Sequence, residues 1–210
     1  MASTDQTSHD KLAERLEQLL AVESFPPPEQ FARDALVNDP AIYEQAAADP
    51  LAWWAQQARA LDWFGEPQTT LDDSRPPFYT WFAGGTINAS YNCLDRHVRD
   101  GLGDRVALHW RGEEGDERDI TYAQLHADVM RFANALKDQG ISEGDVVGIY
   151  LPMIPEVVVA MLACARIGAP HNVVFGGFSP ESVKERMQVS EAKALITADG
   201  ARRKGKVAAV

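Results

Sequence analysis

The chain has 210 residues, and 20 Lys and Arg residues against 31 Asp and Glu residues give it a formal net charge of −11. Its 45% hydrophobic and 24% charged residues are typical of a globular protein and exclude a disordered chain. The acidic balance excludes general nucleic-acid binding, because duplex DNA is held mainly through its phosphates. Cys93 and Cys164 have no second Cys or His at metal-ligand spacing, so we predict reduced thiols in a cytoplasmic protein and no structural zinc.

No segment of the sequence favours export or membrane insertion. Asp5, His9 and Asp10 stand where a signal peptide needs an apolar core. The longest apolar run, residues 157–165, is far shorter than the roughly 20 apolar residues that a membrane-spanning helix requires. We therefore expect a protein without a membrane partner.

Residues 1–77 are expected to form a helical leader region. Leucines at helical spacing predict a helix over residues 9–22, which consecutive prolines then end. Asp39-Pro40 and Asp49-Pro50 each place a capping side chain and a preset φ at a helix start, and the second of these helices is predicted over residues 51–61. The Gly, Pro and Asp residues of 65–77 predict a loop, and we expect the domain boundary there.

From residue 78 on, apolar strands alternate with helices. Strands are predicted over residues 105–110, 146–151, 172–175 and 194–198, and helices over residues 121–137, 155–167 and 179–190. This alternation indicates βαβ units and a parallel sheet that is covered on both faces. We predict an α/β fold in which residues 78–210 form the first part of a doubly wound, mostly parallel sheet. Because the chain stops after a strand and a basic loop, where such a sheet would continue, we expect a fragment of a longer protein.

Ligands of open parallel sheets bind beyond the carboxyl ends of the strands, so the loops after Leu151, Phe175 and Ala198 are the candidate positions. The loop after Phe175 carries Gly176 and Gly177. Glycines at this position permit either close approach of the backbone to a ligand or a tight turn into the next helix, and the residues alone favour neither.

The last ten residues form a basic cluster on an otherwise acidic chain. Arg202, Arg203, Lys204 and Lys206 have no acid among them, so this tail carries +4 and the preceding residues sum to −15. Arginine offers a fork to phosphate oxygens, lysine adds a point charge, and Gly205 bends the chain between them. A phosphate clamp and a solvated basic loop are both consistent with such a run.

The sequence offers no catalytic or metal-binding constellation. Its histidines have no Cys, His or carboxylate at metal-ligand spacing, so we expect surface or structural histidines. Ser90 and Ser179 lack the Gly-x-Ser-x-Gly context of a nucleophile elbow, so a hydrolase triad is not expected. Residues 112–119, with Asp116, Glu117 and Asp119, are expected to form a polar hairpin turn and no paired-carboxylate site.

Several strings of residues, in order along the chain, resemble the AMP-forming acetyl-CoA synthetases. They are Trp81-Phe82-Ala83-Gly84-Gly85, Asn92-Cys93-Leu94-Asp95-Arg96-His97, the segment 160–169 and Phe175-Gly176-Gly177-Phe178-Ser179-Pro180. Phe25-Pro26-Pro27 and Asp49-Pro50 also resemble that family's leader region, so the resemblance covers nearly the whole chain. It implies the N-terminal part of an acetate–CoA ligase, with the start of the large α/β domain of adenylate-forming enzymes after the leader.

The resemblance implies a two-step reaction. Acetate attacks the α-phosphorus of ATP to give acetyl-adenylate and pyrophosphate, and the thiol of coenzyme A then displaces AMP. A magnesium ion would neutralise the phosphates in the first step. The family's phosphate loop, acetate pocket, ribose-binding Asp and C-terminal Lys would all lie beyond Val210, so we expect no catalytic and no metal-binding residue in this chain.

Part of the coenzyme A site is implied to lie within the chain. The family's basic Arg-x-Gly-Arg falls on Arg203, Lys204, Gly205 and Lys206, and its adenine-adjacent Phe-Gly-Gly falls on Phe175, Gly176 and Gly177. Lys206 stands where the family usually has arginine, which keeps the charge and removes the fork. Two alternatives stay open: a fragment of propionyl-CoA synthetase, and a non-catalytic α/β binding module.

Overall fold

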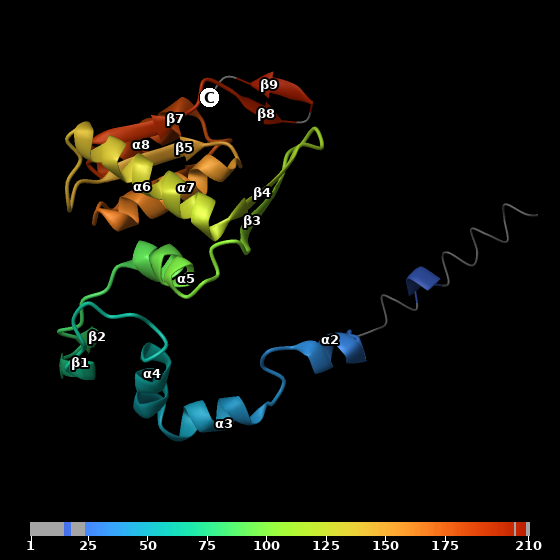
Figure 1. Ribbon diagram of the computed structural model, residues 1–210, viewed down its shortest axis with the longest axis vertical. Helices are drawn as coiled ribbons and strands as arrows, with labels where there is room; N and C mark the ends of the chain where they lie inside the picture. Colours follow the sequence, from blue (N-terminus) through green and yellow to red (C-terminus); the bar gives the residue numbers. More distant parts are fainter. Residues whose placement is uncertain (1–14, 18–23, 204, 209–210) are drawn as a thin grey trace, which may run out of the picture. The chain divides into compact units, whose positions relative to one another are not determined.

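The computed structural model describes residues 15–17, 24–203 and 205–208 (Figure 1), and the chain divides into two compact units, Met1–Trp53 and Trp54–Val210. Within its described residues, the first unit contains helices α2 (Glu29–Asp34) and α3 (Ala41–Ala48) and the start of α4 (Pro50–Ala58). The helix predicted over residues 9–22 lies outside the described residues, apart from residues 15–17, which are helical.

The helix start at Asp49-Pro50 is confirmed, whereas α3 begins one residue later than predicted, with Pro40 in place of Asp39 at its N-cap. The Asp39 carboxylate accepts a hydrogen bond from the Ala41 amide at 2.9 Å, just where α3 begins. The Asp49 carboxylate accepts one from the Ala52 amide at 2.9 Å in the first turn of α4. An aspartate oxygen thus satisfies an amide that has no partner within its own helix.

Helix α4 ends at Ala58 and does not continue to residue 61. The Ala58 carbonyl accepts hydrogen bonds from the Trp63 indole at 2.9 Å and from the Leu61 amide at 3.1 Å. The amides of residues 59–61 each bond to the carbonyl three residues earlier, and the Asp62 amide donates to Asn92 instead of to Ala58, so the helix ends in i→i+3 turns. Trp54 stays half-exposed and meets Trp81 edge to face, with ring centroids 6.4 Å apart.

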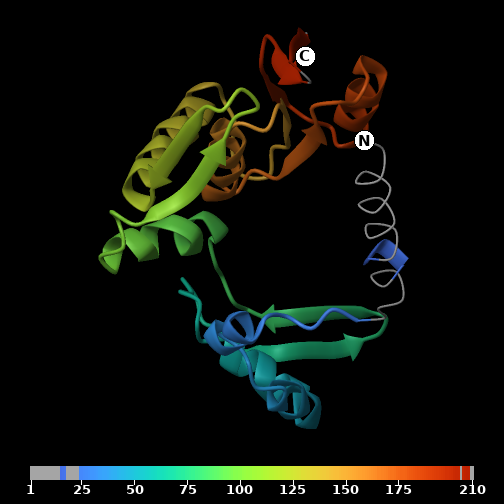
Figure 2. The same cartoon turned by 90° about the vertical axis from the view of Figure 1, so that its right-hand side faces the viewer.

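The largest correction concerns residues 65–77, which are not a loop throughout. Thr69–Arg75 forms a strand, β1, that pairs antiparallel with β2 (Phe78–Ala83), and Leu71 is the register partner of Trp81. Figure 2 shows the two strands side by side, in green. The strand escapes sequence patterning because most of it is exposed and it carries two Asp residues, which strands disfavour. The division expected after residue 77 stays a prediction.

A π-helix, η1 (Tyr91–Asp95), and a short helix, α5 (Arg96–Arg99), follow this hairpin. Strands β3 (Val106–Arg111) and β4 (Glu117–Thr121) then pair antiparallel, which confirms the predicted hairpin turn. Helix α6 (Tyr122–Asp138) begins with a capping box between Thr121 and Gln124. Its buried residues repeat at helical spacing, as the amphipathic pattern predicts: Leu125, Val129, Ala133 and Leu136.

The predicted parallel sheet is confirmed over three strands. β5 (Val147–Leu151) lies between β6 (His171–Phe175) and β7 (Ala194–Thr197), and both neighbours run parallel to it. Helix α7 (Pro155–Arg166) joins β5 to β6, and α8 (Pro180–Val189) joins β6 to β7. From β5 the chain continues to β6 on one side of it and then crosses over β5 to β7 on its other side. Because such crossover connections are right-handed, α7 and α8 lie on opposite faces of the sheet.

The packing agrees with that placement. Val147 and Ile149 are completely buried in the core that α6 and α7 form over one face of the sheet. On the other face, the Asn172 side chain donates to the Arg186 carbonyl of α8 at 3.3 Å. The cover is incomplete at the outer strands, because Val173 and Leu195 are each 44% exposed.

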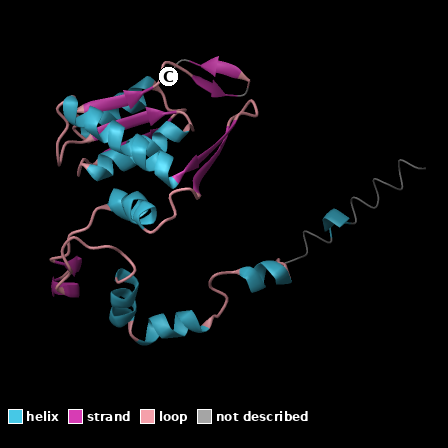
Figure 3. Ribbon diagram, viewed as in Figure 1, coloured by secondary structure: helices cyan, strands magenta, loops and turns pink. Residues whose placement is uncertain are grey.

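The chain is thus mixed α/β with one parallel three-stranded sheet, and Figure 3 shows its strands (magenta) among the helices (cyan). The other sheets of the described residues are two-stranded and antiparallel, including β8 (Ala201–Arg203) with β9 (Lys206–Ala208). The predicted fold class is confirmed at this level.

Candidate functional site

The carboxyl ends of β5 and β7 open into a pocket of about 620 Å³. It is lined by Pro152, Met153 and Ile154 after β5, by residues 198–202 after β7, and by the tip of the β3–β4 hairpin. Two of the three loops that the sequence singles out therefore meet at one pocket. The third loop, after Phe175, does not contribute to its lining.

A single tight turn holds the three candidate residues after β6. Phe175 is 59% exposed, and its carbonyl accepts hydrogen bonds from the amides of Gly177 at 2.7 Å and Phe178 at 3.1 Å. A Cβ on Gly176 would lie 3.1 Å from the Leu151 carbonyl oxygen, so a side chain here would crowd the end of β5. Gly176 therefore lets the turn pass close to the neighbouring strand, which gives this glycine a structural role in addition to any contact with a ligand.

The basic residues lie on the β8–β9 hairpin, Ala201–Ala208, which we call the basic hairpin. Arg203 and Lys206 are register partners on its two strands, and Gly205 has a φ of +71° in the turn between them. The Lys206 side chain is exposed. Lys204 lies outside the described residues. The turn thus brings the backbones of Arg203 and Lys206 together, as a clamp on one anion requires.

Two glutamates at the tip of the β3–β4 hairpin meet the basic hairpin. Glu113 accepts a hydrogen bond from the Gly205 amide at 3.0 Å, and Glu114 forms an ion pair with Arg202. Nothing in the sequence patterns singled out these contacts, because some 90 positions separate the partners. Charge is the one sequence signal that could have predicted these contacts, because two acidic residues between glycines at a hairpin tip complement the basic residues near the end of the chain.

The β3–β4 hairpin is anchored where it borders the pocket. The Trp110 indole donates to the Met153 carbonyl at 2.8 Å, which ties β3 to the loop after β5. Within the hairpin, hydrogen bonds from His109 and Arg111 lower the pKa of the Asp119 carboxyl. These bonds lie between exposed side chains, so the Trp110 contact is the one that joins the hairpin to the loop after β5.

A second polar cluster lies away from the pocket, where η1, α6 and α7 meet. Asp95 accepts hydrogen bonds from Arg166 at 2.7 and 2.8 Å and contacts the His126 ring at 3.0 Å. Burial opposes ionisation of Asp95, but the bonds from Arg166 and His126 outweigh it and lower the pKa of the carboxyl. Two of the family-like strings thus meet through Asp95 and Arg166, which are far apart in the sequence.

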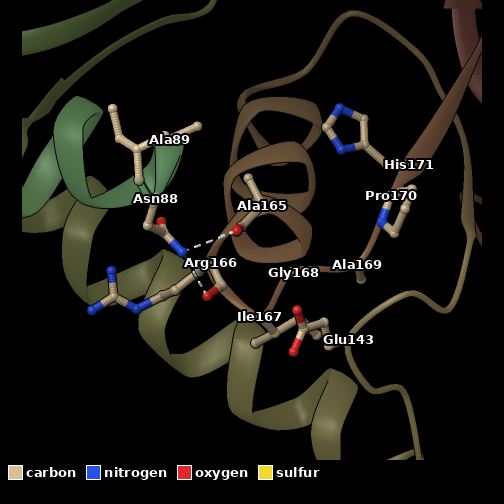
Figure 4. A pocket seen from close by; sticks show the side chains of 11 residues that line it. Asn88, Ala89, Glu143, Ala165, Arg166, Ile167, Gly168, Ala169, Pro170 and His171 are labelled. Carbon is tan, nitrogen blue, oxygen red and sulfur yellow. Dashed lines mark hydrogen bonds between the residues drawn. The ribbon is translucent and has the colours of Figure 1, made fainter. Parts of the chain in front are cut away.

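A pocket of about 610 Å³ lies at the opposite end of the parallel sheet (Figure 4). Its Asn88 side chain donates to the Ala165 and Arg166 carbonyls at 3.3 and 3.1 Å, and so caps the C-terminus of α7. Because this pocket borders the start of β6, it is not at the sheet edge where parallel folds bind ligands.

Of the helices that the structure describes, none combines the length and the apolar character that crossing a membrane requires. Within the same residues, no three His, Cys, Asp or Glu side chains lie together so that they could hold a metal ion. Of the two cysteines, Cys164 is buried and Cys93 is exposed. Burial raises the pKa of the Cys164 thiol to about 11. The Cys164 thiol is therefore neutral near neutral pH.

Two family models match the chain. Residues 40–93 match the model described as "Acetyl-coenzyme A synthetase N-terminus", and residues 94–210 match the one described as "AMP-binding enzyme". The second match covers more than half of the chain.

Individual relatives agree with the family models. The chain is 56% identical over 186 residues to the acetyl-coenzyme A synthetase of Streptomyces coelicolor, covering 89% of this chain and 28% of the relative. It is 53% identical over 191 residues to the acetyl-coenzyme A synthetase of Rubrobacter xylanophilus, covering 90% of this chain and 30% of the relative. The chain therefore spans less than a third of the length of these curated relatives. The resemblance carried by the ordered strings is confirmed: the chain belongs to the AMP-binding enzyme family, and its sequence corresponds to the N-terminal region of the acetyl-coenzyme A synthetases.

Proposed function

We propose that this chain is the N-terminal portion of an ATP-dependent, AMP-forming acetate–CoA ligase that acts in the cytoplasm. The observation that carries the proposal is the 56% identity to a Streptomyces acetyl-coenzyme A synthetase across 89% of the chain. In this proposal, residues 1–77 form the leader, and residues 78–210 begin a doubly wound α/β domain of the adenylate-forming type. The partners are acetate, ATP and coenzyme A, with no nucleic acid and no membrane.

The proposed reaction has two steps. A carboxylate oxygen of acetate attacks the α-phosphorus of ATP, forming acetyl-adenylate as pyrophosphate leaves. The sulfur of coenzyme A then attacks the acetyl carbonyl carbon, AMP leaves, and the thiol proton passes to solvent. The first step needs positioned groups around the triphosphate, and we assign these to residues outside this chain.

Magnesium would neutralise the ATP phosphates in the first step. Among the described residues, no three or more His, Cys, Asp or Glu side chains lie together, so the structure identifies no residue of this chain as a ligand of that ion. We therefore derive no step through magnesium from this chain and assign its ligands to the same outside residues.

The part that this chain plays, in our proposal, is to bind coenzyme A. Arg203, Lys204, Gly205 and Lys206 hold the 3′-phosphate, and Phe175, Gly176 and Gly177 make room for the adenine. Three features support this assignment: the turn that pairs Arg203 with Lys206, the exposure of Lys206, and the exposed Phe175 ring at the carboxyl end of β6. The carboxyl ends of β6 and β7 lie at one edge of the sheet, where parallel folds bind nucleotides.

Substrate assays test the proposal directly. The full-length protein should exchange pyrophosphate into ATP when acetate is present and should form acetyl-CoA, whereas the 210-residue chain should do neither. Propionate in place of acetate is the comparison, and a higher kcat/KM for propionate would favour the propionyl-CoA synthetase alternative. A full-length protein that exchanges pyrophosphate with neither acid would contradict the ligase assignment and leave the binding-module alternative.

A further inference from the structure

We infer that Glu113 and Glu114, the acidic tip of the β3–β4 hairpin, are a tethered competitor for the anion that the basic hairpin binds, and that they set its affinity. This inference rests on the proposed coenzyme A site, because the anion is taken to be a phosphate monoester. The two glutamates affect anion binding through their contacts with the basic hairpin and are not themselves in contact with the substrate.

The first support is the hydrogen bond that Glu113 accepts from the backbone amide of Gly205. This bond measures 3.0 Å and lies in the turn between Arg203 and Lys206. A backbone N–H in a turn flanked by cations is suited to an anionic oxygen, whether of a carboxylate or of a phosphate. The glutamate therefore holds the place in the turn that a phosphate oxygen would take.

The second support is charge. Glu114 pairs with Arg202, so the acidic tip contacts both a cation and an amide of the basic hairpin. Figure 1 shows the tip of the β3–β4 hairpin beside strands β8 and β9. An arriving phosphate meets a cluster whose cations are partly neutralised, and it is repelled by two carboxylates until they move away. Removal of either negative charge should therefore strengthen anion binding.

The third support is that the contact can be displaced. The side chains of Arg202 and Glu114 are 59% and 48% exposed, and ion pairs with this exposure are weak and screened by salt. A phosphate monoester carries close to two negative charges near neutral pH and can replace a single carboxylate. The contact is therefore weak enough for substrate to displace and strong enough to lower the affinity measurably.

The test uses the full-length protein with Glu113→Gln and Glu114→Gln, which keep side-chain size. Each variant should lower the KM for coenzyme A by about two- to five-fold, the range that an exposed ion pair covers, with kcat and acetate-dependent pyrophosphate exchange unchanged. Dephospho-coenzyme A should show no such change, because it lacks the 3′-phosphate. Asp116→Asn is the matched control, since it removes a charge from the same turn at a residue with no described bond to the basic hairpin.

A second measurement separates this inference from the proposed function. Hydrogen exchange of residues 201–208 is followed with and without inorganic phosphate. Phosphate should protect this segment more strongly in the Glu→Gln variants than in the wild type. If it does and no KM changes, the tethered competitor stands and the coenzyme A assignment fails. If the KM for coenzyme A stays the same or rises and phosphate protection does not increase, while Lys206→Ala raises that KM, the inference is overturned and the coenzyme A site survives.

Discussion

The position of Lys206 determines how lysine and arginine would differ there in binding a phosphate. Lys206 is the register partner of Arg203 across a tight turn, so the proposed clamp would take its two cations from adjacent strands. An arginine at position 206 would add a second fork, whereas lysine contributes a point charge whose direction is less fixed. If the proposed site is right, lysine in place of the family's usual arginine changes the geometry of phosphate recognition and leaves the charge unchanged.

At this scale we predict the effect of Arg203→Ala in the full-length protein. A charge-assisted hydrogen bond to phosphate contributes about 1.5 to 3 kcal/mol, so the KM for coenzyme A should rise roughly ten-fold or more. Pyrophosphate exchange should be nearly untouched, because the site that we propose for this cluster binds coenzyme A, which enters only in the second step. Lys206→Arg should be neutral or should lower the KM slightly.

Dephospho-coenzyme A is the control for this prediction. Without the 3′-phosphate, the wild type and Arg203→Ala should have similar KM values. A mutant that loses pyrophosphate exchange and coenzyme A dependence together would instead indicate that the basic hairpin supports the fold.

Helix α7 shows how a single element is held at both ends. Its N-terminal turn places Glu156 in an exposed pair with Arg118, at 53% and 47% side-chain exposure. Its C-terminal turn places Arg166 against Asp95, where the exposures fall to 26% and 17%. Because water screens the first pair and is largely excluded from the second, the pair at the C-terminus should dominate the attachment of α7.

We therefore predict that Arg166→Gln destabilises the full-length protein by about 2 kcal/mol or more, since it leaves a half-buried carboxylate without its fork. The matched change Arg118→Gln should cost less than about 1 kcal/mol. Denaturant titration measures the free energy of unfolding of both variants, and hydrogen exchange of the α7 amides reports the local effect on the helix. Equal effects of the two variants would show that burial does not decide the strength of these pairs.

The same pair predicts a pH dependence. The pKa of Asp95 in the folded chain lies below its ordinary value of 3.8, so folding favours the ionised carboxylate. Its contribution to stability should be complete above pH 3.8 and should be lost as the pH falls through the lowered pKa. Asp95→Asn should remove this acid-dependent part, so the stability curves of mutant and wild type should converge at low pH. Parallel curves down to pH 2 would contradict the assignment.

The elements also show what the sequence could predict. The continuous apolar run of β5 and the 3.6-residue period of α6 specify their structures locally, and both were found within a residue or two. Strand β1 was missed because hydrogen bonds to β2, and not a buried face, hold its polar residues in place. The contact between Glu113 and Gly205 was missed because local patterns carry no information on which distant hairpins meet.

For the molecule as a whole, the outer strands of the parallel sheet determine how the chain behaves by itself. Within the described residues, β6 and β7 each pair on one side only, and Phe175, Val173 and Leu195 are 59%, 44% and 44% exposed. Free strand edges beside exposed apolar side chains promote association with other chains.

We therefore predict that the isolated 210-residue chain is poorly soluble or partly molten. It should bind a dye that reports exposed apolar surface, and its thermal transition should be broad. The full-length protein serves as the control and should bind little dye. A sharp, cooperative transition of the 210-residue chain without dye binding would contradict this prediction and favour a self-contained module.

The strand order β6-β5-β7 has a consequence for vectorial synthesis on the ribosome. The central strand is made before either neighbour, so the sheet grows outward from its middle. Helix α6 precedes β5 and α7 follows it, so one face of β5 can be covered before β7 exists. The other face waits for α8, which is made only after β6. A nascent chain that pauses between α7 and α8 would thus present a half-covered strand pair, and this is the stage at which it most needs a chaperone.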